Sequence, residues 1–449
     1  MNSFRTNFKT FMSRISYLIK NFISFGFAEF ISKIVPFICL PLITRLLPNT
    51  EAFAVYNIFT TITGVGVTIV LLNLHSAVFR EYFEYNSKNE QYNVTRTALS
   101  IVLINAILGA AIIVLCSQYI SLLFFNDLKY QTVVILSAVS ILLVSINYII
   151  ELPTRLENKR TTFIASKLFS SIGYYGIFLL LIVLGYTYYS IIFASIFTAI
   201  LLFIFFSVLN KNFILKGRYD KQIKRNLLNI GLPLLPSSIM YWAYSFISII
   251  MITHFLNLAE LGIYSLTLKI ARIGYVICCV LYSSLTHFVY SRSKDNDYKE
   301  IIGKTFDWLL VLISIIYISI YFCRNLIFKI FATDDYLDGL PLFKYLILVP
   351  FLTFLKNFLL MQFIVIKQPL QQSWFLLLDC ILLITISYLL LPVYGILGVA
   401  IANVTTCFIT LILIIFYVHY KKSIVIIRKR TYIYIVFLIS FLIVSYKYL

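Results

Sequence analysis

Charged residues are scarce in this sequence: Asp, Glu, Lys and Arg make up 12% of its 449 positions, whereas apolar residues make up 61%. A typical soluble domain carries about 25% charged residues. Together with a mean hydropathy of +0.93, this scarcity excludes the soluble classes. The sequence therefore predicts an all-α polytopic membrane protein, because a helix satisfies its own backbone hydrogen bonds within a bilayer.

Acidic residues are rarer still, because 18 Asp and Glu stand against 37 Lys and Arg, for a formal net charge of +19. Such an excess can indicate a nucleic-acid partner, but here the cations fall between apolar runs. No connection between runs exceeds about twenty residues, so no soluble domain can present a basic face or house a catalytic centre. We therefore expect no nucleic-acid partner and no enzyme activity.

Residues that bind metals or nucleotides are few and scattered. The four His and seven Cys show no metal-ligand spacing, and the Cys lie within or at the ends of apolar runs. No Gly-rich run precedes a Lys-Ser or Lys-Thr pair, so ATP is not the direct energy source. We expect neither a metal nor a cofactor.

Long apolar runs are what the sequence does contain. Taking those of about twenty residues as membrane helices gives twelve, near residues 21–44, 53–79, 97–122, 131–152, 162–185, 188–209, 227–256, 261–288, 305–323, 343–366, 373–391 and 396–420. A thirteenth run, 432–449, contains Lys447 and either crosses or lies at the interface.

The distribution of Lys and Arg predicts the orientation. The N-terminus and the connections after even-numbered helices, counted together with Lys167 at the start of the fifth run, hold 27 of the 37 cations. Cytoplasmic loops are the ones enriched in Lys and Arg. The N-terminus is therefore expected in the cytoplasm. Residues 1–20 have four cations but no cleavable apolar core, so they are predicted to be a surface-lying lead-in rather than a signal peptide.

A weak internal repeat divides the chain. A Leu-rich turn that ends in Val55-Tyr56 follows the first helix, and a similar turn that ends in Ile263-Tyr264 follows the seventh, 208 positions later. An even number of helices per unit gives both halves the same orientation. We expect six-helix bundles at 21–210 and 227–420, joined by a basic cytoplasmic linker, 211–226, and followed by the basic segment and run of 421–449.

The first run carries charges and prolines unsuited to lipid. Glu29 precedes Lys33 by four residues, so both lie on one helix face in the favourable order. Intramembrane charges face protein or a water-filled cavity, and Pro36 and Pro41 loosen the helix backbone. The run is either a gating helix or an ordinary helix with a neutralised pair.

Further charges lie within the predicted spans. Lys269 and Arg272, three residues apart, share a helix face, and Lys356 and Asp379 lie in later runs. The cations outnumber the acids, so we expect an anionic ligand such as a diphosphate, held by charge-assisted hydrogen bonds. The alternative is that these charges pair with one another or reach water.

Several motifs carry a resemblance to a known family. They are Ser32-Lys33-Ile34, the stretch Leu40-Pro41-Leu42-Ile43-Thr44-Arg45-Leu46-Leu47-Pro48, Val55-Tyr56, Ala77-Val78-Phe79-Arg80, Gly231-Leu232-Pro233-Leu234-Leu235-Pro236-Ser237 and Leu261-Gly262-Ile263-Tyr264-Ser265 with Lys269-Ile270. The sequence resembles the polysaccharide-transport, or O-antigen flippase, branch of the multidrug/oligosaccharidyl-lipid/polysaccharide flippase superfamily. The resemblance is strongest over residues 20–85 and 228–275.

The resemblance implies two six-helix bundles in a parallel pseudo-twofold repeat around a V-shaped central cavity, with alternating access. It implies a bacterial inner-membrane protein that moves undecaprenyl-diphosphate-linked oligosaccharide units to the outer leaflet for O-antigen, capsule or exopolysaccharide, alongside a polymerase and other assembly proteins. Where family members often carry an acid-Arg pair in helix 7, this chain has Ser248 and Ile249. The coupling ion and the glycan contacts therefore stay open.

The candidate residues follow from both arguments. Lys33, Lys269 and Arg272 attract the diphosphate or an acidic sugar, and Lys356 adds to the field. Arg80 lies near the cytoplasmic mouth and Arg45 near the outer one, and Glu29 and Asp379 are candidate proton or sodium carriers. A cation-coupled multidrug exporter is the second interpretation, which the surplus of cations disfavours. A membrane polysaccharide polymerase is the third, and it lacks a large outer loop.

Overall fold

The computed structural model describes residues 34–157, 159–292, 297–365, 370–421 and 430–431. These residues are helical, without a strand among them, and eleven of their helical segments are long and apolar enough to cross a membrane. The eleven correspond to the second to twelfth predicted runs, so the all-α polytopic fold is confirmed. The first run is described from residue 34 as the shorter helix Ile34–Leu46, and the thirteenth lies outside the described residues.

Most described spans begin one to nine residues before the predicted runs, and most also end one to ten residues before them. They are Thr50–Leu71, Lys88–Leu115, Leu128–Leu156, Thr161–Val183, Tyr189–Leu209, Lys221–Phe255, Leu258–Cys278, Tyr298–Phe322, Asp334–Phe363, Leu370–Tyr394 and Ile396–Tyr420.

Five predicted runs correspond to single helices: α6 (Gln131–Leu156), α9 (Tyr189–Leu209), α15 (Tyr298–Phe322), α19 (Leu370–Tyr394) and α20 (Ile396–Lys421). The others are interrupted. They form α4 (Lys88–Leu115) with α5 (Ser117–Phe125), α7 (Arg160–Leu168) with the π turn η2 (Phe169–Gly173) and α8 (Tyr174–Val183), α11 (Lys221–Gly231) with η3 (Leu232–Leu234) and α12 (Leu235–Phe255), α13 (Leu258–Ala271) with α14 (Ile273–Arg292), and α17 (Leu340–Leu346) with α18 (Leu348–Val365).

The prediction of a single helix over 53–79 is wrong in the same way, because this run is also interrupted. The structure has α2 (Thr50–Leu71) and α3 (Leu74–Tyr82), because Leu72 and Asn73 adopt φ of 48° and 56°. Asn tolerates this left-handed region, but Leu is strained there. The Asn73 amide donates a hydrogen bond to Ser238 Oγ at 3.0 Å, which holds the turn against α12. Hydropathy does not detect such a break, because both sides of it are apolar.

Contacts divide the chain into two compact units. Unit 1 comprises the described residues up to Pro48 together with Ile58–Ile239, and unit 2 comprises Asn49–Asn57 together with the described residues from Met240 onward. Two of the three boundaries fall inside α2 and α12, and the third lies between Pro48 and Asn49, just before α2. The bundle limits 21–210 and 227–420 follow chain order alone and stay a prediction.

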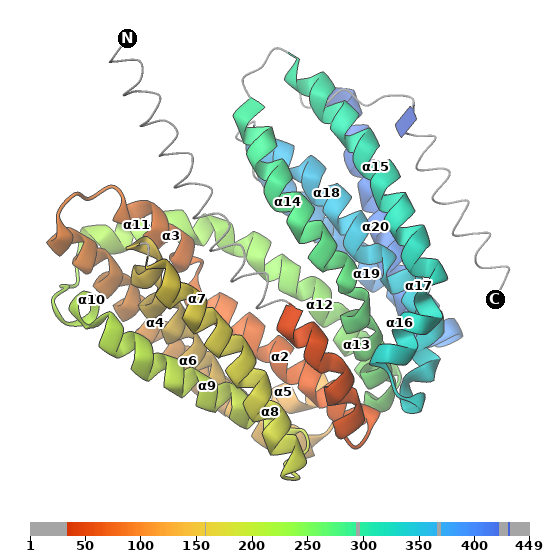
Figure 1. The fold of residues 1–449 in the computed structure, drawn as a ribbon, viewed down its shortest axis with the longest axis horizontal. Coiled ribbons are helices and arrows are strands. Elements are labelled where there is room, and N and C mark those ends of the chain that lie inside the picture. Colours follow the sequence, from red (N-terminus) through yellow and green to blue (C-terminus); the bar gives the residue numbers. More distant parts are fainter. Residues whose placement is uncertain (1–33, 158, 293–296, 366–369, 422–429, 432–449) are drawn as a thin grey trace. The chain divides into compact units, whose positions relative to one another are not determined.

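In unit 1, α4, α6 and α9 run side by side (Figure 1). The segment predicted as a linker is held on this unit: α10 (Lys211–Leu215) packs on α4, the Arg218 N–H donates to Asn93 Oδ1 at 2.7 Å, and the Asp220 N–H donates to Thr97 Oγ1 at 3.1 Å. Asp220 then caps α11 by accepting from the Gln222 and Ile223 N–H groups.

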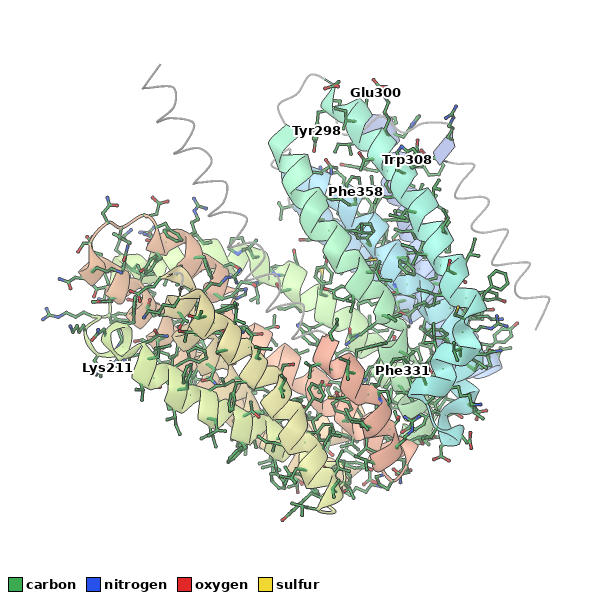
Figure 2. All side chains as sticks on the ribbon, in the orientation of Figure 1. Lys211, Tyr298, Glu300, Trp308, Phe331 and Phe358 are labelled. Carbon is green, nitrogen blue, oxygen red and sulfur yellow. The ribbon has the colours of Figure 1, made fainter. Side chains whose placement is uncertain are left out.

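In unit 2, α18 contacts α14, α15, α19 and α20 (Figure 1). Tyr298 on α15 and Phe358 on α18 lie on two of these neighbouring helices (Figure 2), and the Tyr298 hydroxyl donates to the buried Gln362 one turn beyond Phe358. Unit 2 also contains α16 (Arg324–Phe331) and η4 (Asp334–Gly339), which precede α17.

Local features recur at the spacing of the predicted repeat. Asn49 Oδ1 accepts a hydrogen bond from the Ala52 N–H, and Asn257 Oδ1, 208 positions later, accepts one from the Glu260 N–H, both at 2.9 Å. Cys116 separates long α4 from short α5, and Cys323 separates long α15 from short α16. The shared caps and helix breaks support the repeat.

Candidate functional site

Lys269 on α13 lies beneath the aromatic side chains that begin α2. Its Nζ is 3.1 Å from the ring centroid of Tyr56 and 4.8 Å from that of Phe53. The ammonium is attracted to the electron-rich ring faces. Its Nζ is buried and has no hydrogen-bond partner among the described residues. None of the ammonium's N–H donors is therefore hydrogen-bonded to a described residue.

A close helix contact positions Lys269. A Cβ on Gly262 would lie 2.0 Å from the Thr50 carbonyl oxygen, so α13 and the start of α2 meet at backbone distance, as small residues permit in membrane proteins. Asn57 Nδ2 donates to Ser265 Oγ at 2.9 Å along the same contact. The Gly262-Ile263-Tyr264 motif therefore serves a packing requirement that brings Tyr56 over Lys269.

Arg272 caps the same helix. Its backbone N–H donates to the carbonyls of Leu268 and Lys269 at 3.1 and 3.2 Å, and its side chain is exposed. The two cations that the sequence places in one patch thus lie in different surroundings, since Lys269 Nζ is buried against aromatic rings. Their role as one anion-binding patch stays a prediction.

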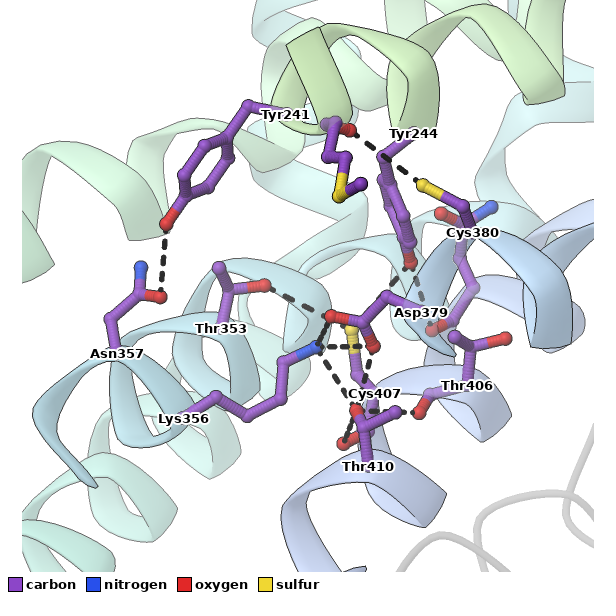
Figure 3. Close-up of polar contacts among 12 residues, drawn as sticks. Tyr241, Tyr244, Thr353, Lys356, Asn357, Asp379, Cys380, Thr406, Cys407 and Thr410 are labelled. Carbon is purple, nitrogen blue, oxygen red and sulfur yellow. Dashed lines mark hydrogen bonds and ion pairs between the residues drawn. The ribbon is translucent and has the colours of Figure 1, made fainter. Parts of the chain in front are cut away.

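Lys356 and Asp379 form a buried ion pair between α18 and α19 (Figure 3). Lys356 Nζ donates to Asp379 Oδ1 and Oδ2 at 2.8 and 2.7 Å and to Thr410 Oγ1, on α20, at 3.1 Å. The Thr410 hydroxyl in turn lies 2.7 Å from Asp379 Oδ1. The pairing that the sequence left open therefore occurs here, and it cancels one cation of the expected surplus.

Polar side chains of α12 and α20 surround this pair (Figure 3). The Cys407 thiol lies 3.7 Å from the Tyr244 hydroxyl and 3.9 Å from Thr353 Oγ1, and the Tyr241 hydroxyl donates to Asn357 Oδ1 at 3.3 Å. These groups give unit 2 a polar interior at the depth of the ion pair.

Ser248, where the resembling family often carries an acid, joins a neutral network. Asn403 Nδ2 donates to Ser248 Oγ at 3.4 Å and to the Tyr264 hydroxyl at 3.1 Å. Ser248 and Asn403 are both buried. The network links α12, α20 and α13, and it supplies hydroxyl and amide groups rather than a charge.

The remaining predicted residues lie elsewhere. Arg80 is exposed on α3, and the exposed Arg45 donates from Nη1 to the Pro41 carbonyl at 2.8 Å at the end of the helix Ile34–Leu46. Glu29 and Lys33 lie outside the described residues. The structure thus brings Lys356 and Asp379 together. Arg45 and Arg80 belong to unit 1, whereas Lys269, Arg272, Lys356 and Asp379 belong to unit 2.

Two lysines of the predicted cytoplasmic connections form ion pairs with an acidic side chain. Lys88 Nζ and Lys159 Nζ lie 3.0 and 2.8 Å from the Glu157 carboxylate, which follows α6. Burial raises the pKa of Glu157, but the hydrogen bonds from Lys159 and Lys88 outweigh burial and hold this pKa below its usual value. The ion pairs stabilise the end of α6, so Lys88 and Lys159 are poor candidates for a substrate contact.

The sequence reasoning missed one intramembrane pair. Glu151 on α6 and Lys167 on α7 lie 2.7 Å apart, in unit 1. Lys167 counts among the cations expected on the cytoplasmic side, and Glu151 is not a candidate residue although it lies within the predicted run 131–152. An acidic residue inside an apolar run was the available signal.

Comparisons with known proteins agree with this architecture. The family described as "Polysaccharide biosynthesis protein" matches residues 42–341. No curated protein matches the chain.

Three solved structures share the fold. The lipid II flippase MurJ, in an inward closed conformation, has a TM-score of 0.73 at 16% identity, with 94% of this chain and 92% of that chain covered. An inward-facing multidrug resistance MATE family transporter of the MOP superfamily has a TM-score of 0.66 at 13% identity, with 87% and 96% covered. A variant of the Vibrio cholerae MATE transporter VcmN has a TM-score of 0.61 at 13% identity, with 93% and 99% covered. At these identities the likeness shows the fold alone.

Proposed function

The chain belongs to the polysaccharide biosynthesis protein family, and from that membership we propose that it is a flippase for lipid-linked oligosaccharides. Its substrate is an undecaprenyl-diphosphate-linked repeat unit of a surface polysaccharide. The protein moves this unit from the cytoplasmic to the outer leaflet of the bacterial inner membrane by alternating access between two six-helix bundles. The likeness to a lipid II flippase supports this proposal at the level of the fold.

The buried ammonium of Lys269 is the observation that carries the proposal. An ammonium has three N–H donors, and none of those on Lys269 is used by a described residue. Leaving such donors unmet within a membrane span is costly. A diphosphate supplies the charge and the acceptor oxygens that they lack. The exposed guanidinium of Arg272, three residues on, adds a donor that matches phosphate geometry.

The other candidate residues have secondary roles in this proposal. Lys33 adds positive charge from the first run, Arg80 acts near the cytoplasmic mouth and Arg45 near the outer mouth. The glycan crosses in water while the polyprenyl tail stays in lipid. Partners in assembly are a polysaccharide polymerase and the other proteins of the pathway.

Ion coupling at Asp379 has a specific requirement. Both of its oxygens are within 2.8 Å of Lys356 Nζ, so a proton or sodium ion must displace this ammonium to bind. A displaced Lys356 then adds its charge to the field that attracts the substrate. Glu29 is the second candidate carrier.

A cation-coupled multidrug exporter is the alternative function, because MATE transporters share the fold at similar identity. The lone ammonium of Lys269 repels a cationic drug, and the matched family is one of polysaccharide biosynthesis. A membrane polymerase is the least supported, since the structural neighbours named above are transporters.

The test is a gene deletion followed by mass spectrometry of lipid extracts, with impermeant labelling to assign the leaflet. We expect complete single repeat units to accumulate on the cytoplasmic side. Accumulation on the outer side would instead indicate a polymerase, and unchanged lipid-linked glycans would indicate small-molecule export.

Variants then test the site. Lys269→Gln with Arg272→Gln should abolish surface polysaccharide at normal protein level, because Lys269 Nζ donates no hydrogen bond to a described residue that the variant would lose. Lys269→Arg should retain part of the export. The matched control is Lys129→Gln, which removes an exposed cation paired with Asp127. Full export by the double variant would refute the role of these two residues.

A further inference from the structure

A cavity of about 280 Å³ lies within unit 1, where α6, the α7–η2–α8 segment and α9 meet (Figure 1). All three elements belong to candidate membrane spans. Its polar lining includes Asn147, Glu151, Lys167, Ser170, Tyr174 and Thr198. A lining with this many polar groups is unusual at membrane depth, since each needs a hydrogen-bond partner.

The two charged side chains that line this cavity are of opposite sign and form an ion pair. Glu151 Oε1 and Lys167 Nζ lie 2.7 Å apart, with side chains that are 18% and 28% exposed. A bound cation would meet the Lys167 ammonium, and a bound anion would meet the Glu151 carboxylate. The pair therefore favours a neutral ligand that can accept from one partner and donate to the other.

Two buried polar atoms of the lining lack partners. Asn147 Nδ2 donates to the Ala199 carbonyl at 2.8 Å, which fixes the amide and leaves Oδ1 without a partner among the described residues. Thr198 Oγ1 is likewise unpartnered. Asn147 and Thr198 are 7% and 5% exposed. An unmet buried group carries its full desolvation cost, so a ligand that hydrogen-bonds to both is stabilised.

The η2 turn shapes one wall of the cavity. Its five residues, Phe169–Gly173, follow a π rather than an α path, and such turns occur often at functional sites. The Ser170 hydroxyl, within η2, donates to the backbone carbonyl of Lys167 at 2.9 Å. This hydrogen bond connects the turn to a residue of the ion pair. Tyr148, which is half-exposed, and Tyr174 add aromatic faces to the lining.

The size of the cavity limits the ligand. With about 30 Å³ for each water molecule, its volume corresponds to only a small cluster of waters. It also lies at the lower end of pockets for drug-sized molecules, which begin near about 300 Å³. A single sugar ring fits these limits, and its hydroxyl groups both donate and accept while its apolar face packs on aromatic rings.

We propose that this cavity binds one neutral monosaccharide unit. The proposal rests on the flippase function proposed above and adds to it a glycan subsite in unit 1, separate from the lysine that attracts the diphosphate. Asn147 Oδ1 accepts from a sugar hydroxyl, Thr198 Oγ1 donates to or accepts from another, and the Glu151–Lys167 pair selects against charged sugars.

The test is saturation-transfer NMR on the purified full chain in detergent. The probes are glucose, galactose and N-acetylglucosamine, with glucuronic acid and glucosamine as charged counterparts. Millimolar concentrations are needed, because a ligand of this size binds with a Kd on the order of 1 mM. We expect a signal from at least one neutral sugar and a weaker one from the charged sugars.

Two variants of one residue provide the matched comparison. Thr198→Val removes the unpartnered hydroxyl at nearly constant volume and should weaken binding by about 3- to 10-fold, as the loss of one hydrogen bond does. Thr198→Ser keeps the hydroxyl and should bind as the wild type does. Ser195→Ala, at another lining position, serves if Thr198→Val fails to fold, as judged by circular dichroism.

The proposal is overturned if no neutral sugar gives a signal or if charged sugars bind more tightly than neutral ones. It is also overturned if Thr198→Val and the wild type bind a sugar equally. Each of these results would mean that the cavity holds only water. These results are separable from those of the deletion experiment. Cytoplasmic accumulation of repeat units without sugar binding would refute the subsite and support the flippase function. Sugar binding without accumulation would refute the flippase function and support a sugar-binding cavity.

Discussion

Two buried lysines of unit 2 meet opposite surroundings. Lys356 is paired with Asp379 and hydrogen-bonded to Thr410, whereas the Lys269 ammonium lies against the faces of Tyr56 and Phe53 and has no hydrogen-bond partner among the described residues. The ion pair of Lys356 offsets part of the cost of burial. The same residue type in the same kind of apolar helix is thus paired at one position and packed on aromatic rings at the other, where we propose that it binds the substrate.

We predict that Lys356→Met destabilises the protein by about 3–5 kcal/mol, because it leaves the Asp379 carboxylate buried without its partner. The double variant Lys356→Met with Asp379→Leu should recover most of that loss, since neither charge then remains. Thermal unfolding of the purified chain in detergent measures both.

Thr410→Val is the control for this pair, because it removes a hydroxyl that contacts both Lys356 and Asp379 and leaves both charges. It should cost about 1 kcal/mol. Additive losses in the double variant would mean that Lys356 and Asp379 do not interact. Retained polysaccharide export by a stable double variant would remove both residues from the transport mechanism.

At the scale of elements, backbone contacts between helices depend on glycine. A Cβ on Gly262 would lie 2.0 Å from the Thr50 carbonyl oxygen, and one on Gly231 would lie 2.4 Å from the Leu72 carbonyl oxygen. The first contact joins α13 to the start of α2, and the second joins α11 to the turn that ends α2. Both glycines belong to motifs that the sequence marked as family features, and the structure supplies the reason for them.

Gly262→Ala should lower stability by about 1–3 kcal/mol, because the added methyl forces α13 away from Thr50. Gly176→Ala on α8 is the control, since no atom lies within 4 Å of the added carbon. There the change should be neutral or stabilising by up to about 1 kcal/mol, because alanine favours the helix. Equal effects at the two positions, in unfolding by heat, would argue against the close approach.

At the scale of the whole molecule, charge and repeat together predict the membrane orientation. Cys116 and Cys323 are exposed, and each separates a long helix from a short one. Cys116 lies near the end of the third predicted run, 97–122, and Cys323 ends the ninth, 305–323, so a cytoplasmic N-terminus places both toward the outer face. Two helix ends 207 positions apart thus share one expected side of the membrane.

Labelling of intact cells with a membrane-impermeant maleimide should therefore modify Cys116 and Cys323 in variants that keep either one as the sole cysteine. Ser87→Cys in a cysteine-free background is the inside control, because Ser87 precedes α4 in a predicted cytoplasmic connection. Mass spectrometry of the purified chain reads out the labelling. Labelling at position 87 alone would contradict the predicted orientation and indicate the opposite one.

The sequence alone determined the class of the protein, the number and approximate limits of its described spans and the residues that burial makes costly. Hydropathy and charge suffice for these features, because hydrocarbon acts on every segment in the same way. This local logic found Lys269, Lys356 and Asp379, and it could have found Glu151.

Only the tertiary structure decided how those residues are used. Lys356 and Asp379 lie 23 positions apart on separate helices, and no local pattern indicates that they pair. The aromatic cover on Lys269 comes from α2, and the ion pair of Glu151 comes from α7. Pairing and exposure are set by the packing of helices distant in sequence, so the difference between a lysine paired with an acid and one packed on aromatic rings appears only in the folded chain.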